Sequence, residues 1–330
     1  MYTIQTIDTH AISDQQLQAL YQLETAMTER YGFLPRIANA DDYRSSYLST
    51  FAEGDELLLI QNSDQPHGVI SFKASADWNG KARYELTLRL SVPTIRPALA
   101  EVLHSLLAEK TAQHPYIAVI TYNAELTDLL KNYTAKTQLK ANVYTLDKQA
   151  IDLPMLDALA TQCQAQNENL TLTYVNGLPD QYLDQWCSLF AETGTDMADE
   201  REEAYVPYII TPEVQRKNQA KWATTNLAHH CCMIFDGEQM VAITNVSVNN
   251  NDPRFPYQFM VGVKADYRGR GLGKWLYAAM YQKLAQAVDF ETLHVKHHPE
   301  NTAAIAVSEW AGYQLGYQET TCLVEFSKKA

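Results

Sequence analysis

The second half of the chain shows the clearest alternation of apolar and polar positions. Residues 171–175 (TLTYV) alternate with the period of a strand, and residues 178–194 have helical spacing, with Pro179 in the first turn and Gly194 at the end. Asp236-Gly237 separates two apolar, strand-like runs and predicts a hairpin. The remaining predicted elements are a helix over 211–226, a strand over 257–263, a helix over 271–287, a strand over 292–296, a helix over 301–312 and a strand over 317–326.

The first half of the chain repeats this order of elements. It contains helices near 13–30 and 41–52, a hairpin around 62–67, a strand over 83–92, a helix over 95–111, a strand over 116–122, a short helix over 125–132 and a strand over 140–147. A repeated order of elements predicts tandem copies of one structural unit. We therefore expect an α/β (α+β) fold with two domains, over 1–150 and 169–330, each closed by its own last strand, and a linker over 151–168.

The composition narrows the class of protein. The chain has 330 residues, of which 46% are hydrophobic and 20% charged, values typical of a globular protein with two domains. Its net charge of −13 argues against nucleic acid or an anionic membrane as the main partner. No apolar run reaches the roughly 18 to 20 residues of a membrane span, and the first residues lack the pattern of a signal peptide. Five cysteines without a CxxC pair favour buried free thiols, and so a cytoplasmic location.

The segment 267–276, YRGRGLGKWL, places three glycines between a predicted strand and a predicted helix. Bare backbone N–H groups at a helix N-terminus bind phosphate, and glycine allows the backbone to approach the ligand closely. A Walker loop would need glycine at position 268, and a dinucleotide-binding loop would need glycine at position 274, but the chain has arginine and lysine there. The pattern that remains is Arg268-x-x-Gly271-x-Gly273.

This pattern resembles the acyl-CoA pyrophosphate loop of the GNAT superfamily of N-acyltransferases. Residues 297–313 (HHPENTAAIAVSEWAGY) resemble the second cofactor segment of that family, and the resemblance covers about 170–326. It implies mixed, mostly antiparallel sheets flanked by helices, acetyl-CoA as co-substrate, and a central strand that parts from its neighbour to pair with the pantetheine arm. The cofactor-binding residues that it implies are Val261, Gly262, Val263, Arg268, Gly269, Arg270, Gly271, Leu272, Gly273, Lys274, Asn301 and Ala304.

The corresponding segment of the first half lacks the glycines. Aligning the arginine at 96 with the one at 268 places Pro97, Leu99 and Glu101 opposite the three glycines. Proline has no N–H to donate, leucine blocks close approach of the backbone, and glutamate repels a phosphate. We therefore expect the first copy to bind no CoA in this way, and to be structural or to shape the acceptor site.

The reaction that the resemblance implies is the direct attack of a neutral amine on an acyl thioester. It needs a base, a backbone N–H for the developing oxyanion (at 261 or 262), and an acid for the leaving thiolate. His297 follows the predicted strand over 292–296 and is the candidate base. Many family members carry a tyrosine acid seven residues after the asparagine, and Ser308 stands at that position here. A serine hydroxyl is a weaker acid than a tyrosine, so this sequence departs from the family at the acid.

Other residues are candidates to contact the acceptor. Tyr257 and Gln258 open the central strand, and the acidic run over 196–203 (Asp196, Asp199, Glu200, Glu202 and Glu203) could hold a cationic amine. The His229-His230 pair lacks partners at the spacing of metal ligands, so we expect no metal site.

Three functions are compatible with these features. The first is an acetyl-CoA-dependent N-acetyltransferase that acts on a primary amine, either a small molecule or a peptide, as a monomer or a homodimer. The second is a non-catalytic module that binds or senses acyl-CoA, which the serine at 308 favours. The third is an aminoacyl-tRNA-dependent transferase, against which the intact CoA loop and the net charge of −13 argue.

Overall fold

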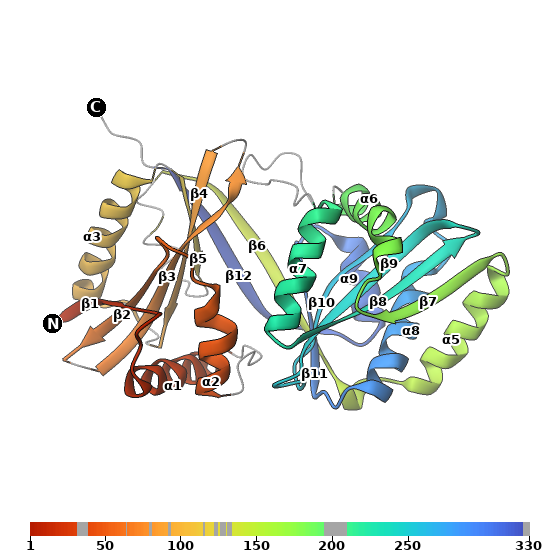
Figure 1. Cartoon of the computed structure of the whole chain (residues 1–330), viewed down its shortest axis with the longest axis horizontal. Helices are drawn as coiled ribbons and strands as arrows, with labels where there is room; N and C mark the ends of the chain where they lie inside the picture. Colours follow the sequence, from red (N-terminus) through yellow and green to blue (C-terminus); the bar gives the residue numbers. More distant parts are fainter. Residues whose placement is uncertain are drawn as a thin grey trace. The chain divides into compact units, whose positions relative to one another are not determined.

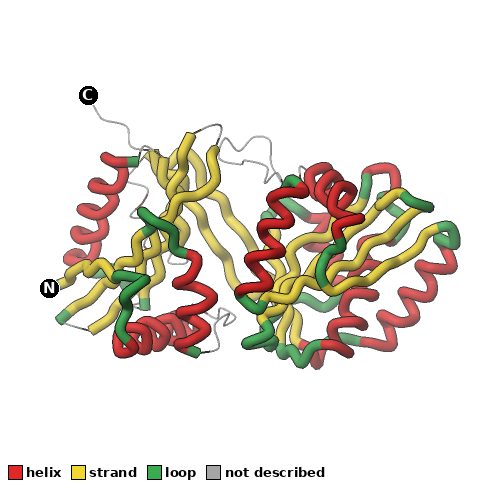
Figure 2. Tube along the Cα trace, viewed as in Figure 1, coloured by secondary structure: helices red, strands yellow, loops and turns green. Residues whose placement is uncertain are grey.

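The computed structural model describes residues 1–31, 39–63, 65–78, 81–91, 94–114, 116–121, 125, 130, 134–194 and 210–325. These residues form two compact units. Among the described residues, the first unit consists of the residues up to Ala141 and those from Tyr317 onward. The second unit consists of the residues from Asn142 to Gly316. In each unit helices lie on the faces of a sheet (Figures 1 and 2), which confirms the predicted fold class.

The first unit is a mixed sheet in which only one described strand pair is parallel. Its strands are β1 (Tyr2–Ile7), β2 (Glu56–Asn62), β3 (Gln65–Trp78), β4 (Lys81–Leu90), β5 (Tyr116–Thr121) and the end of β12 (Gln314–Glu325), in the order β1-β2-β3-β4-β5-β12. Strands β4 and β5 are parallel, and the other neighbours are antiparallel. The helices are α1 (Asp14–Tyr31), α2 (Ala40–Asp42) and α3 (Pro97–Gln113), with a π-helical turn over Tyr43–Tyr47 and a 3₁₀ turn over Leu48–Thr50.

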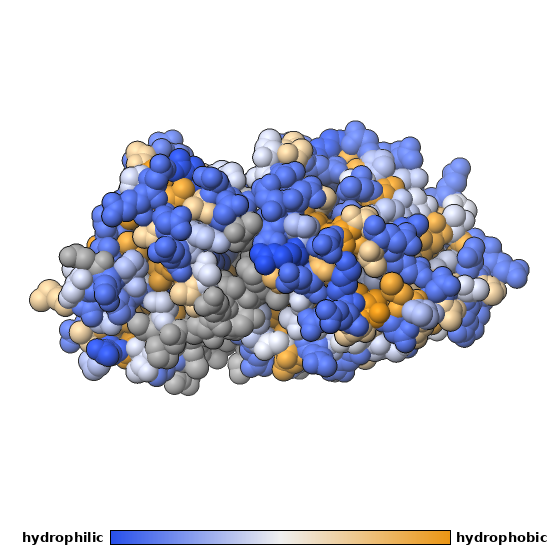
Figure 3. Space-filling model, turned by 90° about the horizontal axis from the view of Figure 1, so that it is seen from below, coloured by the Kyte–Doolittle hydropathy of each residue, from blue (hydrophilic) through white to orange (hydrophobic). Residues whose placement is uncertain are grey.

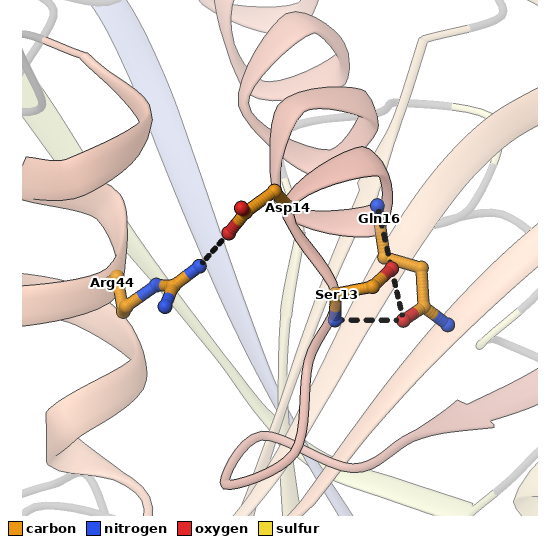
Figure 4. Close-up of polar contacts among 4 residues, drawn as sticks. All are labelled: Ser13, Asp14, Gln16 and Arg44. Carbon is orange, nitrogen blue, oxygen red and sulfur yellow. Dashed lines mark hydrogen bonds and ion pairs between the residues drawn. The ribbon is translucent and has the colours of Figure 1, made fainter.

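The run ELLLIQ in β2 is apolar at successive positions because the strand is buried on both faces. Leu57 and Leu59 pack with α1, whereas Leu58 and Ile60 pack with α3. At the start of α1, Ser13 and Gln16 hydrogen-bond each other's side chain and backbone, with Ser13 N 3.1 Å from Gln16 Oε1 and Gln16 N 3.3 Å from Ser13 Oγ (Figure 4). This reciprocal cap satisfies N–H groups that have no partner inside the helix.

The second unit has the same layered organisation. Its strands are the end of β6 (Thr134–Asp147), β7 (Leu170–Asn176), β8 (Leu227–Asp236), β9 (Gln239–Asn249), β10 (Tyr257–Val263) and β11 (Thr292–His297), in the order β6-β11-β10-β9-β8-β7. Strands β10 and β11 are parallel, and the other neighbours are antiparallel. The helices are α5 (Leu153–Gln166), α6 (Leu183–Gly194), α7 (Pro212–Thr224), α8 (Leu272–Ala287) and α9 (Thr302–Trp310), with 3₁₀ turns over Lys148–Ala150, Asp180–Tyr182 and Ala265–Tyr267.

Helices cover both faces of this second sheet. Cys232 and Ile234 of β8 point to the face that α5 and α8 cover, and their neighbours Cys231 and Met233 point to the face that α6 covers. The predicted hairpin lies between β8 and β9, where Gly237 has φ +58°. We call the face covered by α5 and α8 the α8 face and the opposite one the α6 face.

The two halves exchange their last strands, which the sequence did not predict. Strand β6, expected to close the first domain, pairs with β11 of the second unit from Thr292↔Asp147 to His297↔Asn142. Strand β12, expected to close the second domain, pairs with β5 of the first unit from Thr320↔Thr121 to Glu325↔Tyr116. Alternation along a strand shows that it has a sheet neighbour but carries no information on which sheet that neighbour belongs to.

The segment 151–168, expected to be a linker, contains α5 and lies in the second unit. The helix begins at an aspartate cap, because Asp152 Oδ1 accepts from Met155 N at 2.9 Å. It packs on α8 through Leu156 and Cys163, which are 1% and 3% exposed. Its polar composition reflects the opposite, solvated side of the helix.

The surface is mainly polar on the face that Figure 3 shows, where apolar side chains form small separate groups. The exposed large hydrophobic side chains among the described residues are Met1, Leu153, Phe259 and Leu315. None of the described helices combines the length and the apolar character that a membrane crossing requires.

Candidate functional site

Strand β10 parts from its parallel neighbour in the middle of the second sheet. Its pairing with β11 has only the positions Tyr257↔His294 and Gln258↔Val295, whereas its pairing with β9 continues to Val263↔Ala242. In the first unit, the equivalent parallel strands β4 and β5 stay paired from Tyr84↔Ile117 to Leu88↔Thr121. One edge of β10, from Met260 onward, is therefore turned away from β11, as the sequence resemblance implied for a pantetheine-binding strand.

The glycine loop follows this edge directly. Gly269 and Gly271 have φ +76° and +77°, left-handed values that side chains rarely adopt. A Cβ at Gly269 would meet nothing within 4 Å, so the space beside the loop is open. Gly271 is the residue before α8 and caps it with no side chain. Within the described part of the chain, no acceptor is found for the backbone N–H groups of residues 269–274, and the first helical bond runs from Trp275 N to Gly271 O at 3.0 Å.

The same segment carries three cationic side chains. Arg268 is exposed and its Nε donates to Val263 O at 3.1 Å. Arg270 donates through Nε to Asn167 Oδ1 at 3.1 Å, and its guanidinium lies 5.3 Å from the ring centre of Tyr267. Lys274 lies with Nζ 4.7 Å from the Trp310 ring centre. The loop thus combines unpaired N–H groups, positive charge and a helix N-terminus, which together suit a pyrophosphate.

The predicted residue Asn301 is the N-cap of α9. Its Oδ1 accepts from Ala304 N at 3.1 Å, so both predicted residues of this segment belong to one helix cap. Leu272 is 1% exposed and anchors the start of α8 in the core. Gly273 is half-buried, and a Cβ there would lie 3.7 Å from Val261 Cγ1, an ordinary contact.

Two candidates nominated separately from the sequence lie in contact. His297 Nε2 is 2.7 Å from Ser308 Oγ, and Ser308 Oγ is 3.0 Å from the hydroxyl of Tyr277 on α8. Ser308 is 0% exposed. Burial lowers the pKa of His297 to about 4 and raises the pKa of Tyr277 to about 12, because the charged form of each is disfavoured away from water. Both side chains are therefore neutral at neutral pH.

A second buried polar network was missed by the sequence reasoning. Gln258, expected to face an acceptor, is 0% exposed and turned to the α8 face, where its Oε1 accepts from the Tyr281 hydroxyl at 2.5 Å. The hydroxyls of Tyr281 and Tyr313 are 2.8 Å apart, and Gln258 Nε2 donates to Thr244 Oγ1 at 3.1 Å. The only sequence signal was a pair of tyrosines, at 277 and 281, spaced one turn apart on the apolar side of a predicted helix.

Tyr257, the other acceptor candidate on β10, lies among aromatic rings. The ring centre of Tyr257 lies 4.7 Å from that of Phe259 and 4.8 Å from that of His294. The acidic run over 196–203 lies outside the described residues. Residues His229 and His230 lie inside β8, and among the residues that the structure describes no group of His, Cys, Asp or Glu could hold a metal ion.

The first unit lacks the features of the loop at the equivalent place. Arg96 precedes α3, Pro97 is its first residue, and Leu99 is 0% exposed. The backbone N–H of Ile95 donates to a carboxylate oxygen of Glu125 at 2.6 Å. An acidic side chain thus already lies against this loop, and a phosphate would be repelled there.

Comparisons with known proteins agree with this geometry. The acetyltransferase (GNAT) family model matches residues 194–313. No curated protein matches the sequence significantly. Among solved structures, a tandem GNAT protein from the clavulanic acid biosynthesis pathway has a TM-score of 0.71 at 12% identity, with 100% of each chain covered.

Two further structures share the fold. A GCN5-related N-acetyltransferase from Sphaerobacter thermophilus has a TM-score of 0.62 at 13% identity, covering 98% of this chain and 95% of that one. A glucosamine N-acetyltransferase region of a fungal multi-domain GH3 beta-N-acetylglucosaminidase has a TM-score of 0.64 at 11% identity, covering 98% of this chain and 38% of that one. Residues 194–313 therefore form a domain of the GNAT acetyltransferase family, and the chain as a whole has the tandem GNAT fold.

Proposed function

We propose that the protein is an acetyl-CoA-dependent N-acetyltransferase with one working site, in the second unit, and that its acceptor is a primary amine. The observation that carries this proposal is the succession of the parted strand β10 and the glycine loop at the N-terminus of α8. Among its described residues the first unit has neither feature, since β4 and β5 stay paired and Glu125 lies against its loop.

The residues present fit acetyl-CoA as co-substrate. The backbone N–H groups of residues 269–274 suit the pyrophosphate, and Arg268, Arg270 and Lys274 supply compensating charge. The free edge of β10 at 261–263 offers backbone groups to the amide-bearing pantetheine arm. Bound acetyl-CoA supplies an activated acetyl group, so that an amide C–N bond forms as the thioester C–S bond breaks.

The protein's own groups would handle charge and protons. The backbone N–H of Val261 is the candidate donor to the oxyanion, because Lys264 N donates to Val241 O and the alternation along β10 turns the N–H of Gly262 toward β9 as well. Ser308 is the candidate donor of a proton to the departing sulfur. The amine nitrogen would release a proton to solvent and the serine hydroxyl would regain one from solvent, so that the products are the amide and the free thiol. The Tyr277 O–H and a neutral His297 N–H can both donate to Ser308 Oγ, which leaves the serine O–H to point elsewhere. His297 and Tyr277 would then act as positioning residues for this hydroxyl.

A substitution at Gly273 tests the cofactor site. Gly271→Glu is unsuitable because φ +77° strains any side chain, whereas Gly273 has an ordinary backbone and room for a Cβ. Glutamate in the first turn of a helix favours folding, so lost binding cannot be ascribed to a weakened helix. We expect Gly273→Glu to weaken acetyl-CoA binding at least about 100-fold by calorimetry, and the neutral control Gly273→Gln to weaken it less, because charge repulsion adds to obstruction. Unchanged affinity in Gly273→Glu would place the cofactor elsewhere.

Turnover is measured separately, by release of free thiol from acetyl-CoA with a panel of amines. Thiol release that depends on the amine supports the enzyme. Tight binding without turnover across aromatic, aliphatic and peptide amines would instead support the non-catalytic module that binds or senses acyl-CoA.

A further inference from the structure

Strand β10 carries a bulge beside the point where it leaves β11. The register with β9 shifts between Gln258 and Met260, which leaves Phe259 as the extra residue. Its side chain is 45% exposed, although large apolar side chains are normally buried. Bulges recur next to active sites because they re-aim a side chain, and this one turns a phenyl ring out of the sheet.

Phe259 is part of a row of rings that we call the aromatic row: Trp222 of α7, His229 of β8, Phe259 and Tyr257. Ring centres are 4.3 Å apart for Trp222 and His229, 6.2 Å for His229 and Phe259, and 4.7 Å for Phe259 and Tyr257. The last two pairs are edge-to-face. Burial lowers the pKa of His229 to about 4, so all four rings are uncharged at neutral pH.

A buried amide lies against the aromatic row. Asn245 of β9 is 4% exposed and its Nδ2 is 2.7 Å from His229 Nε2. His229 Nδ1 lies 3.6 Å from Cys231 Sγ, whose thiol can in turn donate to the His229 carbonyl at 3.9 Å. This series of hydrogen bonds makes Nδ1 of His229 the protonated nitrogen and Nε2 the acceptor of the Asn245 N–H. The other amide atom, Asn245 Oδ1, is a buried acceptor that has no hydrogen-bond partner among the described residues.

The strand register places these groups near Val261, the candidate donor to the oxyanion. His229, Ser247 and Tyr257 pair across three strands, and Asn245 lies two positions further along β9 on the same face, opposite Met260. Phe259 is two residues from Val261, or about 7 Å along the strand. A two- or three-carbon linker spans such a distance between an amine nitrogen and a ring.

The geometry points to an acceptor-recognition site for arylalkylamines, formed by the aromatic row and Asn245. This inference rests on the proposed acetyl transfer and names the class of amine. The rings receive a flat aromatic group, and Asn245 Oδ1 accepts one hydrogen bond from a donor on that group, which satisfies the buried acceptor. The aromatic row and Asn245 include no carboxylate, so they offer an aliphatic diamine no counter-ion for a second ammonium.

The test compares three matched probes with the full-length protein: tyramine, 2-phenylethylamine and n-hexylamine. We expect kcat/KM to be highest for tyramine, about tenfold lower for 2-phenylethylamine, which lacks the ring donor, and lower still for n-hexylamine. Asn245→Ala should remove the difference between the two aromatic amines. Phe259→Ala, at an exposed position that folding tolerates, should lower kcat/KM for both aromatic amines about tenfold and lower that for n-hexylamine much less, because an alkyl chain makes no ring-to-ring contact. Leu153→Ala, a second exposed apolar side chain, is the control and should change none of these values.

Failure of this inference can be told apart from failure of the proposed function. Tyramine binding is therefore also measured by calorimetry, without turnover, in the presence of CoA. If no amine is acetylated but tyramine binds and Phe259→Ala weakens that binding, the recognition site stands and the transferase assignment falls. Equal kcat/KM for tyramine and n-hexylamine, or tyramine binding unaffected by Phe259→Ala, overturns the recognition site.

Discussion

Gly262, the residue before the last one of β10, lies at a close contact between this strand and α6 and is also a candidate cofactor position. A Cβ built on Gly262 would lie 2.5 Å from Thr193 Oγ1, 3.0 Å from Thr193 Cβ and 3.1 Å from Met260 Cε. The methionine end can move aside. Thr193 cannot do so easily, because it lies in the last turn of α6 and its Oγ1 donates to Leu189 O at 2.8 Å. We therefore predict that Gly262→Ala pushes α6 away from β10.

The size of the effect follows from these contacts. Overpacking by one methyl group costs about 1–3 kcal/mol in a tightly packed interior. Thr193→Ala removes the atom at 2.5 Å but keeps the Cβ at 3.0 Å, so it should relieve only part of the clash. In the double variant we expect the free energy of unfolding to recover by about 1 kcal/mol relative to the sum of the single changes.

Urea unfolding, followed by tryptophan fluorescence, gives the four free energies of this double-mutant cycle. The buried Trp186 lies in α6 itself and reports on its environment. Acetyl-CoA affinity and kcat, measured in parallel, should fall in Gly262→Ala because the backbone N–H groups of β10 are displaced. If Gly262→Ala is as stable as the parent, or if the effects of Gly262→Ala and Thr193→Ala simply add in the double variant, α6 does not require glycine at this position.

Three further predictions concern the acid, the pH dependence and the exchanged strand. Ser308→Ala should lower kcat about 100-fold while leaving acetyl-CoA affinity unchanged, as expected for lost proton donation; equal kcat in the variant removes serine from the mechanism. His229 stays neutral in the folded protein, so its contribution to stability is present above pH 6.5 and is lost as the pH falls toward about 4, by roughly 2 kcal/mol between pH 8 and pH 5. His297 has a similarly lowered pKa and contributes separately, so in urea titrations at the two pH values His229→Gln should lose about 2 kcal/mol less than the parent protein. Deleting residues 318–330 should expose β5 and speed hydrogen exchange in the first unit; protection unchanged at 117–119 would contradict the strand exchange.

Local pattern was enough to predict most elements of this protein. Alternation and capping signals located the hairpin at Gly237 and the helix after the glycine loop, because these depend on the properties of nearby residues. The glycine loop could also be predicted from the sequence, because the left-handed backbone at Gly269 and Gly271 favours glycine, and glycine stands at both positions. The assignment of the cofactor site to the second half followed from the same signal.

Partners that are distant along the chain were decided only by the tertiary structure. The pairing of β6 with β11 and of β12 with β5 could not be foreseen, because either sheet satisfies the same alternation. The contact of His297 with Ser308, the burial of Gln258 and the unpartnered oxygen of Asn245 arise from packing between elements. A sequence therefore specifies which groups are available for chemistry, while burial and neighbours specify their charge, direction and unused hydrogen bonds.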